Sequence, residues 1–131
     1  MPDSFQLPSG NIGCDVYRSS PDGSDPSLDC QVIKHDFTPE QSPHGAGTCV
    51  GATLTSGGKA SVSCPSDVRR WIGKAHGMPV EDGSGPLETA AYGMTYTTGK
   101  QACSVTEQGL TCWNADSAHG FAMSRQRLDV W

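Results

Sequence analysis

Six cysteines constrain the fold of this chain more than any other feature, because they fall into three local couples. The members of the couples are 16, 15 and 9 positions apart. Structural zinc sites and redox motifs place two cysteines only a few residues apart, and no such pair occurs in the sequence. We therefore predict sequential disulfides rather than a metal site. The expected bonds are Cys14–Cys30, Cys49–Cys64 and Cys103–Cys112.

The third couple fits a β-hairpin. Its midpoint falls just before Gly109, a residue that can adopt the left-handed backbone conformation of a tight turn. A hairpin centred there places Cys103 directly opposite Cys112, within reach of a disulfide. The other two couples also enclose turn-forming segments, residues 19–26 and 55–59.

The second couple matches a hairpin less well than the third. Cys64 lies nearer to the centre of the enclosed turn than Cys49, so we expect a bulge in one strand. In the chain-entropy model, a disulfide that closes a loop of about fifteen residues contributes roughly 3 kcal/mol, against a typical total stability of about 5 to 15 kcal/mol. The disulfides are therefore expected to decide whether the domain folds.

The rest of the sequence predicts a small all-β domain. Its 131 residues include 16 glycines and 9 prolines spread along the whole chain, which is typical of short strands separated by turns. Only 35% of the residues are hydrophobic, so we expect a single domain over residues 1–131 with one modest core. The expected architecture is a disulfide-stapled β-barrel or sandwich of antiparallel hairpins. The predicted strands cover residues 12–17, 30–34, 48–54, 60–64, 91–96, 102–105, 110–113 and 121–124.

One segment has helical instead of alternating periodicity. Apolar residues from Val68 to Ala75 recur at the spacing of one helix face. We predict one short α-helix over about residues 67–76, with Ser66 as its N-cap. The three basic residues of this segment lie on its other side. We therefore expect Trp71 to pack across an open end of the sheet and the basic side to face water.

Charge and hydrophobicity exclude several classes of partner. Nine Lys and Arg against 14 Asp and Glu give a net charge of −5, which opposes nucleic-acid binding. No apolar run is long enough to span a bilayer, so no membrane span is expected. Disulfides persist outside the cytoplasm, which predicts an extracytoplasmic protein. The residues after Met1 lack the features of a secretory signal, so Met1 is either a native start or an engineered one after a removed signal peptide.

The sequence contains no recognisable catalytic or cofactor motif. A GxSxG elbow, a phosphate-binding loop and a dinucleotide fingerprint are all missing, and sequential pairing leaves no free thiol. We therefore expect no enzymatic activity, no cofactor and no metal. His119 is the most suggestive histidine because Asp116 and Ser117 lie near it in the sequence. A loop histidine satisfied by backbone groups is the simpler interpretation.

Aromatic side chains supply further binding candidates. Tryptophan and tyrosine combine a large apolar surface with a polar group, so exposed pairs of them are candidate contacts for a sugar or a peptide. Packing of Trp113 in the core, against the disulfide of Cys112, is the more ordinary use of that side chain. The aromatic candidates are Trp71, Trp113, Trp131, Tyr92 and Tyr96.

Distinct motifs lie at the two ends of the chain. Residues 5–14 read FQLPSGNIGC, residues 109–114 read GLTCWN, and residues 119–125 read HGFAMSR. The chain resembles a family of actinobacterial secreted domains of unknown function, which open with Phe-x-x-Pro-Ser-Gly-Asn-Ile-x-Cys and close with a similar second motif. A Tyr-Gly step at 92–93 and an Ala-x-x-x-Cys stretch at 60–64 occur between them in similar order.

The resemblance implies a disulfide-bonded extracytoplasmic module, found alone behind a signal sequence or lipid anchor, or as the outer part of a larger envelope protein. It carries over no catalytic residue. We expect a non-enzymatic binding module at a bacterial cell surface, whose partner is a protein or a cell-envelope polymer. The expected binding residues are Trp71, Tyr92, Tyr96, Trp113, His119 and Arg125.

Two other functions are open at this point. Members of the family normally begin with an export signal, and the lack of one after Met1 fits a structural protein that decorates the capsid or tail of an actinobacterial phage. A small secreted cell-wall hydrolase or hydrolase inhibitor is the third hypothesis, and it rests on His119 with the nearby Asp116. The sequence leaves the identity of the ligand and the oligomeric state undetermined.

Overall fold

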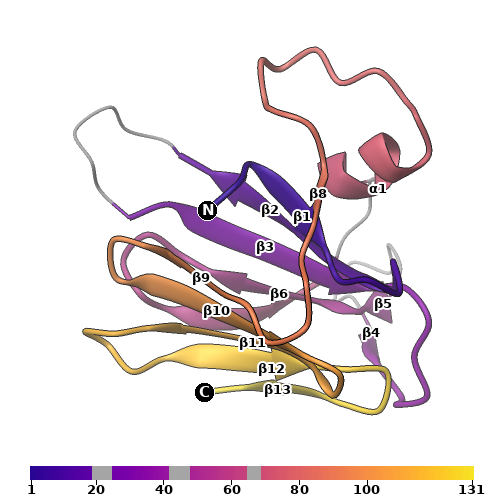
Figure 1. Cartoon of the computed structure of the whole chain (residues 1–131). Helices are drawn as coiled ribbons and strands as arrows, with labels where there is room; N and C mark the ends of the chain where they lie inside the picture. The colour runs from indigo at the N-terminus through magenta and orange to yellow at the C-terminus, as the bar shows by residue number, and fades with distance from the viewer. Residues whose placement is uncertain (19–24, 42–47, 65–68) are drawn as a thin grey trace.

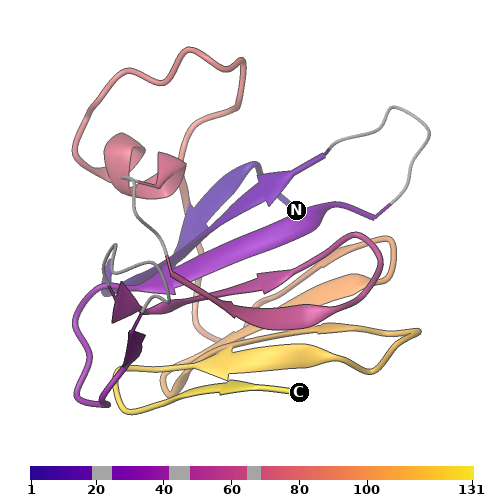
Figure 2. The ribbon, with the colours of Figure 1, turned by 180° about the vertical axis from the view of Figure 1, so that it is seen from behind.

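The computed structural model describes residues 1–18, 25–41, 48–64 and 69–131, and β-strands dominate it (Figure 1). In these ranges the strands form one six-stranded sheet, one five-stranded sheet and a small two-stranded ladder. The two large sheets lie face to face as layers, and Figure 2 shows the same layers from behind. Of the two expected architectures, the fold is therefore the sandwich and not a closed barrel.

The first sheet pairs the amino-terminal strands with the β6–β7 hairpin. All neighbours in it are antiparallel except β1 and β8, which run parallel. Its spatial order is β7 (Ala60–Ser63), β6 (Gly51–Leu54), β3 (Ser27–Val32), β2 (Ile12–Tyr17), β1 (Ser4–Gln6) and β8 (Glu88–Thr89).

The second sheet is an antiparallel meander of the last five strands. Its spatial order is β13 (Leu128–Val130), β12 (Gly120–Met123), β11 (Gly109–Asn114), β10 (Gln101–Thr106) and β9 (Thr95–Thr98). The predicted strand over 91–96 begins only at Thr95, because a turn precedes it. In that turn Gly93 has a φ of 90°, and the Met94 amide donates to the Ala91 carbonyl at 3.2 Å. The short ladder consists of β4 (Glu40–Gln41) and β5 (Thr48–Cys49).

All three predicted disulfides are present, and no cysteine is free. The strand register places Cys14 opposite Cys30 and Cys103 opposite Cys112. The hairpin between Cys103 and Cys112 uses Gly109 at a φ of 133°, as expected.

The disulfide between Cys49 and Cys64 confirms the expected irregularity. In the β6–β7 hairpin Gly51 pairs with Ser63, so the same register would place Val50 opposite Cys64. The bond reaches Cys49 instead, one residue before Val50 in the chain. The break between β5 and β6 at Val50 supplies this extra residue.

The core lies between the two sheets. The sulfur atoms of Cys14, Cys30 and Cys112 lie within 4.8 Å of one another, so the disulfides of the two sheets meet in the core. All three sulfurs are already bonded, so this cluster offers no thiolate to a metal. The largest completely buried side chains of the sandwich are Phe5, Phe121, Leu28, Leu54 and Leu110.

Helix α1 (Arg70–Ala75) confirms the predicted helix, and it lies on the outer side of the first sheet, over β1 and β2 (Figures 1 and 2). Trp71 is completely buried against Gly13 of β2. A β-carbon on residue 13 would lie 2.3 Å from Cδ2 of the indole, so only glycine leaves room for this ring. The expected N-cap, Ser66, lies outside the described residues.

The prediction that the basic side of the helix faces water is wrong. Arg69 places Nη1 2.6 Å from Oδ2 of Asp29, and Lys74 donates from Nζ to the Gly85 carbonyl at 2.6 Å. The reason is the location of the helix. It covers the outer face of the sheet, where Asp15 and Asp29 form a registered pair, rather than an open end of the sheet.

Candidate binding surfaces

The structure buries two of the six expected binding residues. Trp71 has no exposed surface beneath the helix, and Tyr96 is only 9% exposed. The ring of Tyr96 packs on Phe5 between the sheets, with centroids 4.8 Å apart. Neither side chain presents a face to a ligand, so both serve packing. The other four residues lie in two separate surface regions.

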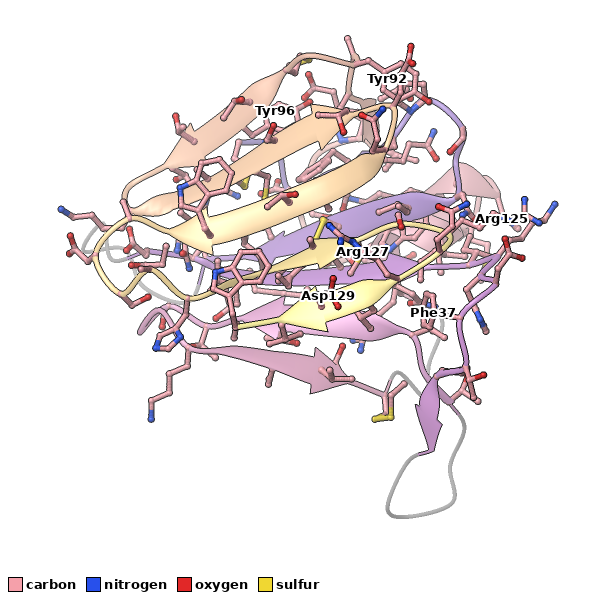
Figure 3. All side chains as sticks on the ribbon, turned by 90° about the horizontal axis from the view of Figure 1, so that it is seen from below. Phe37, Tyr92, Tyr96, Arg125, Arg127 and Asp129 are labelled. Atoms are coloured by element: carbon pink, nitrogen blue, oxygen red, sulfur yellow. A yellow bond between two sulfur atoms is a disulfide. The ribbon has the colours of Figure 1, made fainter. Side chains whose placement is uncertain are left out.

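The first region is a cleft of about 380 Å³ at one end of the sandwich, which we call the end cleft. Tyr92 and Arg125 both line it, and Figure 3 shows them at the same end of the molecule. Segments from both sheets form its walls: the β1–β2 turn, the residue Lys34 after β3, the β10–β11 turn and the β12–β13 turn. Loops from a rigid scaffold that meet in this way are a common location of binding sites.

Asn11 of the amino-terminal motif holds one wall of the end cleft in place. Its side-chain Nδ2 donates to the Lys34 carbonyl at 2.9 Å, and its Oδ1 accepts from the Lys34 amide at 2.6 Å. The Asn11 amide in turn donates to Oγ of Ser9 at 3.3 Å. Both polar groups of the Asn11 side chain are therefore used to shape the cleft, so this part of the motif has a structural role.

The polar groups at the mouth of the end cleft carry mixed charge. Arg125 is 56% exposed at its side chain, and its Nε donates to Oδ2 of Asp36 at 3.1 Å. The Asp36 amide also donates to the Arg125 carbonyl at 2.7 Å, which ties this turn to the first sheet. Lys34 and Glu107 add one charge of each sign. The arrangement suits a polar ligand that offers both hydrogen-bond donors and acceptors.

The second region is the outer face of the five-stranded sheet, around Trp113 and Trp131. The expected packing of Trp113 against the core disulfide is wrong, because neighbouring residues of a strand point to opposite faces and Cys112 takes the core side. Trp113 is half-buried on the outside. Trp131 directly follows β13 and is 48% exposed.

His119 lies beside Trp131 on this face. Both residues line a hollow of about 420 Å³ that also includes Lys59. The carboxylate of Asp116 lies 3.4 Å from Nζ of Lys100. Within the described part of the chain, no hydrogen bond joins the His119 ring to Asp116 or Ser117; the Ser117 hydroxyl accepts from the His119 backbone amide at 3.2 Å. His119 and Trp131 therefore form one contact surface.

A third group of charged residues, under α1, was missed by sequence reasoning. Asp15 is completely buried, and its Oδ1 accepts from Oγ of Ser4 at 2.8 Å and lies 3.6 Å from Nε of Arg70. Burial raises the pKa of the Asp15 carboxyl, although the Ser4 hydrogen bond and the Arg70 charge lower it. The available sequence signals were the aspartate between apolar residues in β2 and the two arginines, Arg69 and Arg70, at the start of the helix. These contacts attach the helix to the sheet.

Comparison of the chain with models of protein families, with curated proteins and with solved structures found no match. The resemblance to the actinobacterial secreted domains therefore stays a prediction. The three disulfides in a small β-sandwich indicate an oxidising, extracytoplasmic environment. In the ranges that the structure describes, no helix has the length and hydrophobicity needed to cross a membrane.

Proposed function

We propose that this protein is a non-enzymatic binding module at a bacterial cell surface, and that it holds a polar part of a protein or cell-envelope polymer in the end cleft. The observation that carries the proposal is the convergence of turns from both sheets on this one cleft. Tyr92 and Arg125, two residues that the sequence suggested for binding, both line it.

The scaffold supports binding because it fixes the walls of the end cleft before a partner arrives. The disulfide between Cys103 and Cys112 closes the hairpin whose turn lines the cleft. On the opposite wall, Asn11 fixes Lys34 through two hydrogen bonds. Preformed walls reduce the conformational entropy lost on association, so more of the contact energy appears as affinity.

The groups in the end cleft favour binding over catalysis. Tyr92 is 46% exposed and offers an aromatic face with a hydroxyl. Within the described residues, Arg125 uses Nε for its contact with Asp36, so its two terminal nitrogens are available to a ligand. Among the residues that the structure describes, no histidine or cysteine lines the cleft, so these lining residues offer neither of the two common catalytic groups.

The proposal is tested by binding of the fluorescently labelled, oxidised protein to intact actinobacterial cells and to purified cell walls. The double variant Tyr92→Ser/Arg125→Ser should bind at least about tenfold more weakly, since two central contacts are lost. Met78→Ser is the matched control, because Met78 is 54% exposed and lies near α1, away from the cleft-lining residues.

Two results would contradict the proposal. The first is no saturable binding of the parent protein to either preparation. The second is a double variant that binds like the parent while its melting temperature is unchanged. A decrease in binding that Met78→Ser shares would also count against the cleft, because it would indicate a nonspecific effect of removing exposed apolar surface.

A further inference from the structure

A strip of uncharged residues crosses the outer face of the five-stranded sheet. The strand register places one residue of each strand in this row, and the paired backbone hydrogen bonds of Gly120 with Trp131 extend the row to the last residue. We call it the tryptophan strip. Its members, in spatial order, are Thr97, Ala102, Trp113, Gly120 and Trp131. Figure 3 looks onto this face, on which Asp129 is labelled.

Gly120 lies between the two tryptophans of the strip and places no side chain between them. A β-carbon at this position would lie 2.2 Å from the Cys112 carbonyl oxygen, so the backbone of the neighbouring strand excludes any larger residue. Ala102, on the other side of Trp113, is only 8% exposed although it lies on the outer face. Small residues therefore flank Trp113 on both sides in this row.

The spacing of the two indoles suits an extended sugar chain. Neighbouring strands lie about 4.8 Å apart, so Trp113 and Trp131 are separated by two strand spacings, or roughly 10 Å. Two successive pyranose rings of an extended β-1,4-linked glycan advance the chain by a similar distance. The two indoles can then stack on the apolar C–H faces of two sugar rings, and the one ring between these two lies above Gly120.

Hydroxyl groups beside the strip supply the polar half of this recognition. The next row of the register contains Thr95, Ser104 and Thr111, whose hydroxyls both donate and accept hydrogen bonds. The same row ends at Asp129, whose carboxylate lies 3.2 Å from Nε of Arg127. Aromatic faces next to uncharged hydroxyls match a sugar, which has apolar ring faces and hydroxyl edges.

The surface available to a glycan continues from Trp131 past the edge of the five-stranded sheet. The hollow of about 420 Å³ lies on the flank of Trp131, and Lys59 and His119 line it. A substituent of a bound ring, such as an acetamido group, would enter this hollow next to the indole. From these observations we propose that the tryptophan strip binds an extended β-1,4-linked glycan chain. This site uses none of the residues of the end cleft, so the two proposals stand or fall separately.

The probes for the test are chitohexaose and cellohexaose, which are extended β-1,4-linked chains, and maltohexaose, whose α-1,4 linkages give a curved chain. Titration calorimetry on the oxidised protein should detect binding of at least one extended chain and none of maltohexaose. Trp131→Ala should weaken that binding by about tenfold or more, because a stacked ring loses its platform. Trp131→Tyr should restore part of it.

Met78→Ala is the matched control, because Met78 is about as exposed as Trp131 but lies beside α1, away from both the tryptophan strip and the end cleft. It should leave glycan binding unchanged. The proposal is overturned if neither extended chain binds, if maltohexaose binds equally well, or if Trp131→Ala binds like the parent. It is also overturned if the strip is covered by a second copy of the chain, which sedimentation would show as a dimer that Trp131→Ala dissociates.

Discussion

The contact between Gly13 and Trp71 makes a sharp test of how the helix is attached. The substitution Gly13→Ala adds one methyl group on the outer face of β2, directly under the indole. Its carbon would lie 2.3 Å from Cδ2 of Trp71, whereas carbon atoms in contact normally lie about 3.5 to 4.0 Å apart. The ring must therefore move outward by more than about 1 Å, and α1 must move with it.

The expected loss of stability follows from this displacement. Overpacking of a well-filled site costs about 1 to 3 kcal/mol, and complete loss of a buried tryptophan costs about 3 to 5 kcal/mol. Because the added atom meets a rigid ring held under the helix, we expect about 3 kcal/mol, between full accommodation and detachment of the helix. For a domain of this size, that corresponds to a melting temperature roughly 10 to 15 °C lower.

Urea unfolding followed by circular dichroism measures the effect in a double-mutant cycle with Trp71→Leu. The smaller leucine leaves space for the new methyl group, so Gly13→Ala should cost at least about 1 kcal/mol less in the Trp71→Leu background. Gly57→Ala is the matched control. A β-carbon there meets only the Thr55 hydroxyl oxygen at 3.9 Å, so its effect should stay within about 0.5 kcal/mol or be slightly stabilising.

Two results would refute the reasoning. Gly13→Ala could unfold with the free energy of the parent, which would mean that the indole does not fill the space above residue 13. Alternatively, the cost could be the same with and without Trp71→Leu. The loss would then come from the strand itself and not from its contact with the helix.

Two further predictions concern buried polar groups. Burial raises the pKa of Asp15, so its contribution to stability is complete below the unfolded-state pKa of about 3.9 and is lost as the pH rises through the higher folded-state pKa. Asp15→Asn should therefore gain stability relative to the parent over that window, and unfolding curves with equal stability differences at pH 3 and pH 7 would exclude this. Gln101→Ala should cost about 1 to 3 kcal/mol, because the Gln101 side chain donates to the carbonyls of Pro26 and Thr55 at 3.0 and 2.9 Å and leaves them unpaired when removed. Gln108→Ala, at an exposed turn, should leave the melting temperature unchanged, and equal losses in the two variants would contradict the assigned role of Gln101.

Local sequence patterns predicted the hairpins well, but they predicted poorly which distant segments pair with these hairpins or pack on them. The spacing of Cys103 and Cys112 around Gly109 is enough to define a hairpin, because both partners are close in the sequence. The parallel pairing of β1 with β8 joins segments more than 80 residues apart, as the pairing of Phe5 with Glu88 shows. No local pattern encodes such a contact, and both strands were absent from the prediction.

The candidate sites show the same division. Sequence reasoning selected Tyr92 and Arg125 for binding, but their meeting in the end cleft depends on how the two sheets stack. It also selected Trp71, which has the same side chain as Trp131 but is completely buried. Side-chain chemistry identifies residues that are able to bind, whereas burial, which is a property of the whole fold, decides whether they are available.

The sequence by itself determined the three disulfides, the all-β class, the short helix and the oxidising compartment, because each depends on the spacing of nearby residues or on composition. Only the tertiary structure decided which face of the sheet the helix covers and which tryptophans remain outside. The physical reason is that strand periodicity divides side chains between two faces without saying which face is covered. Here Arg69 and Arg70 pair with Asp29 and Asp15 and hold the helix on the outer face of the first sheet. In the described part of the chain, the outer face of the second sheet keeps Trp131 48% exposed and Trp113 half-buried.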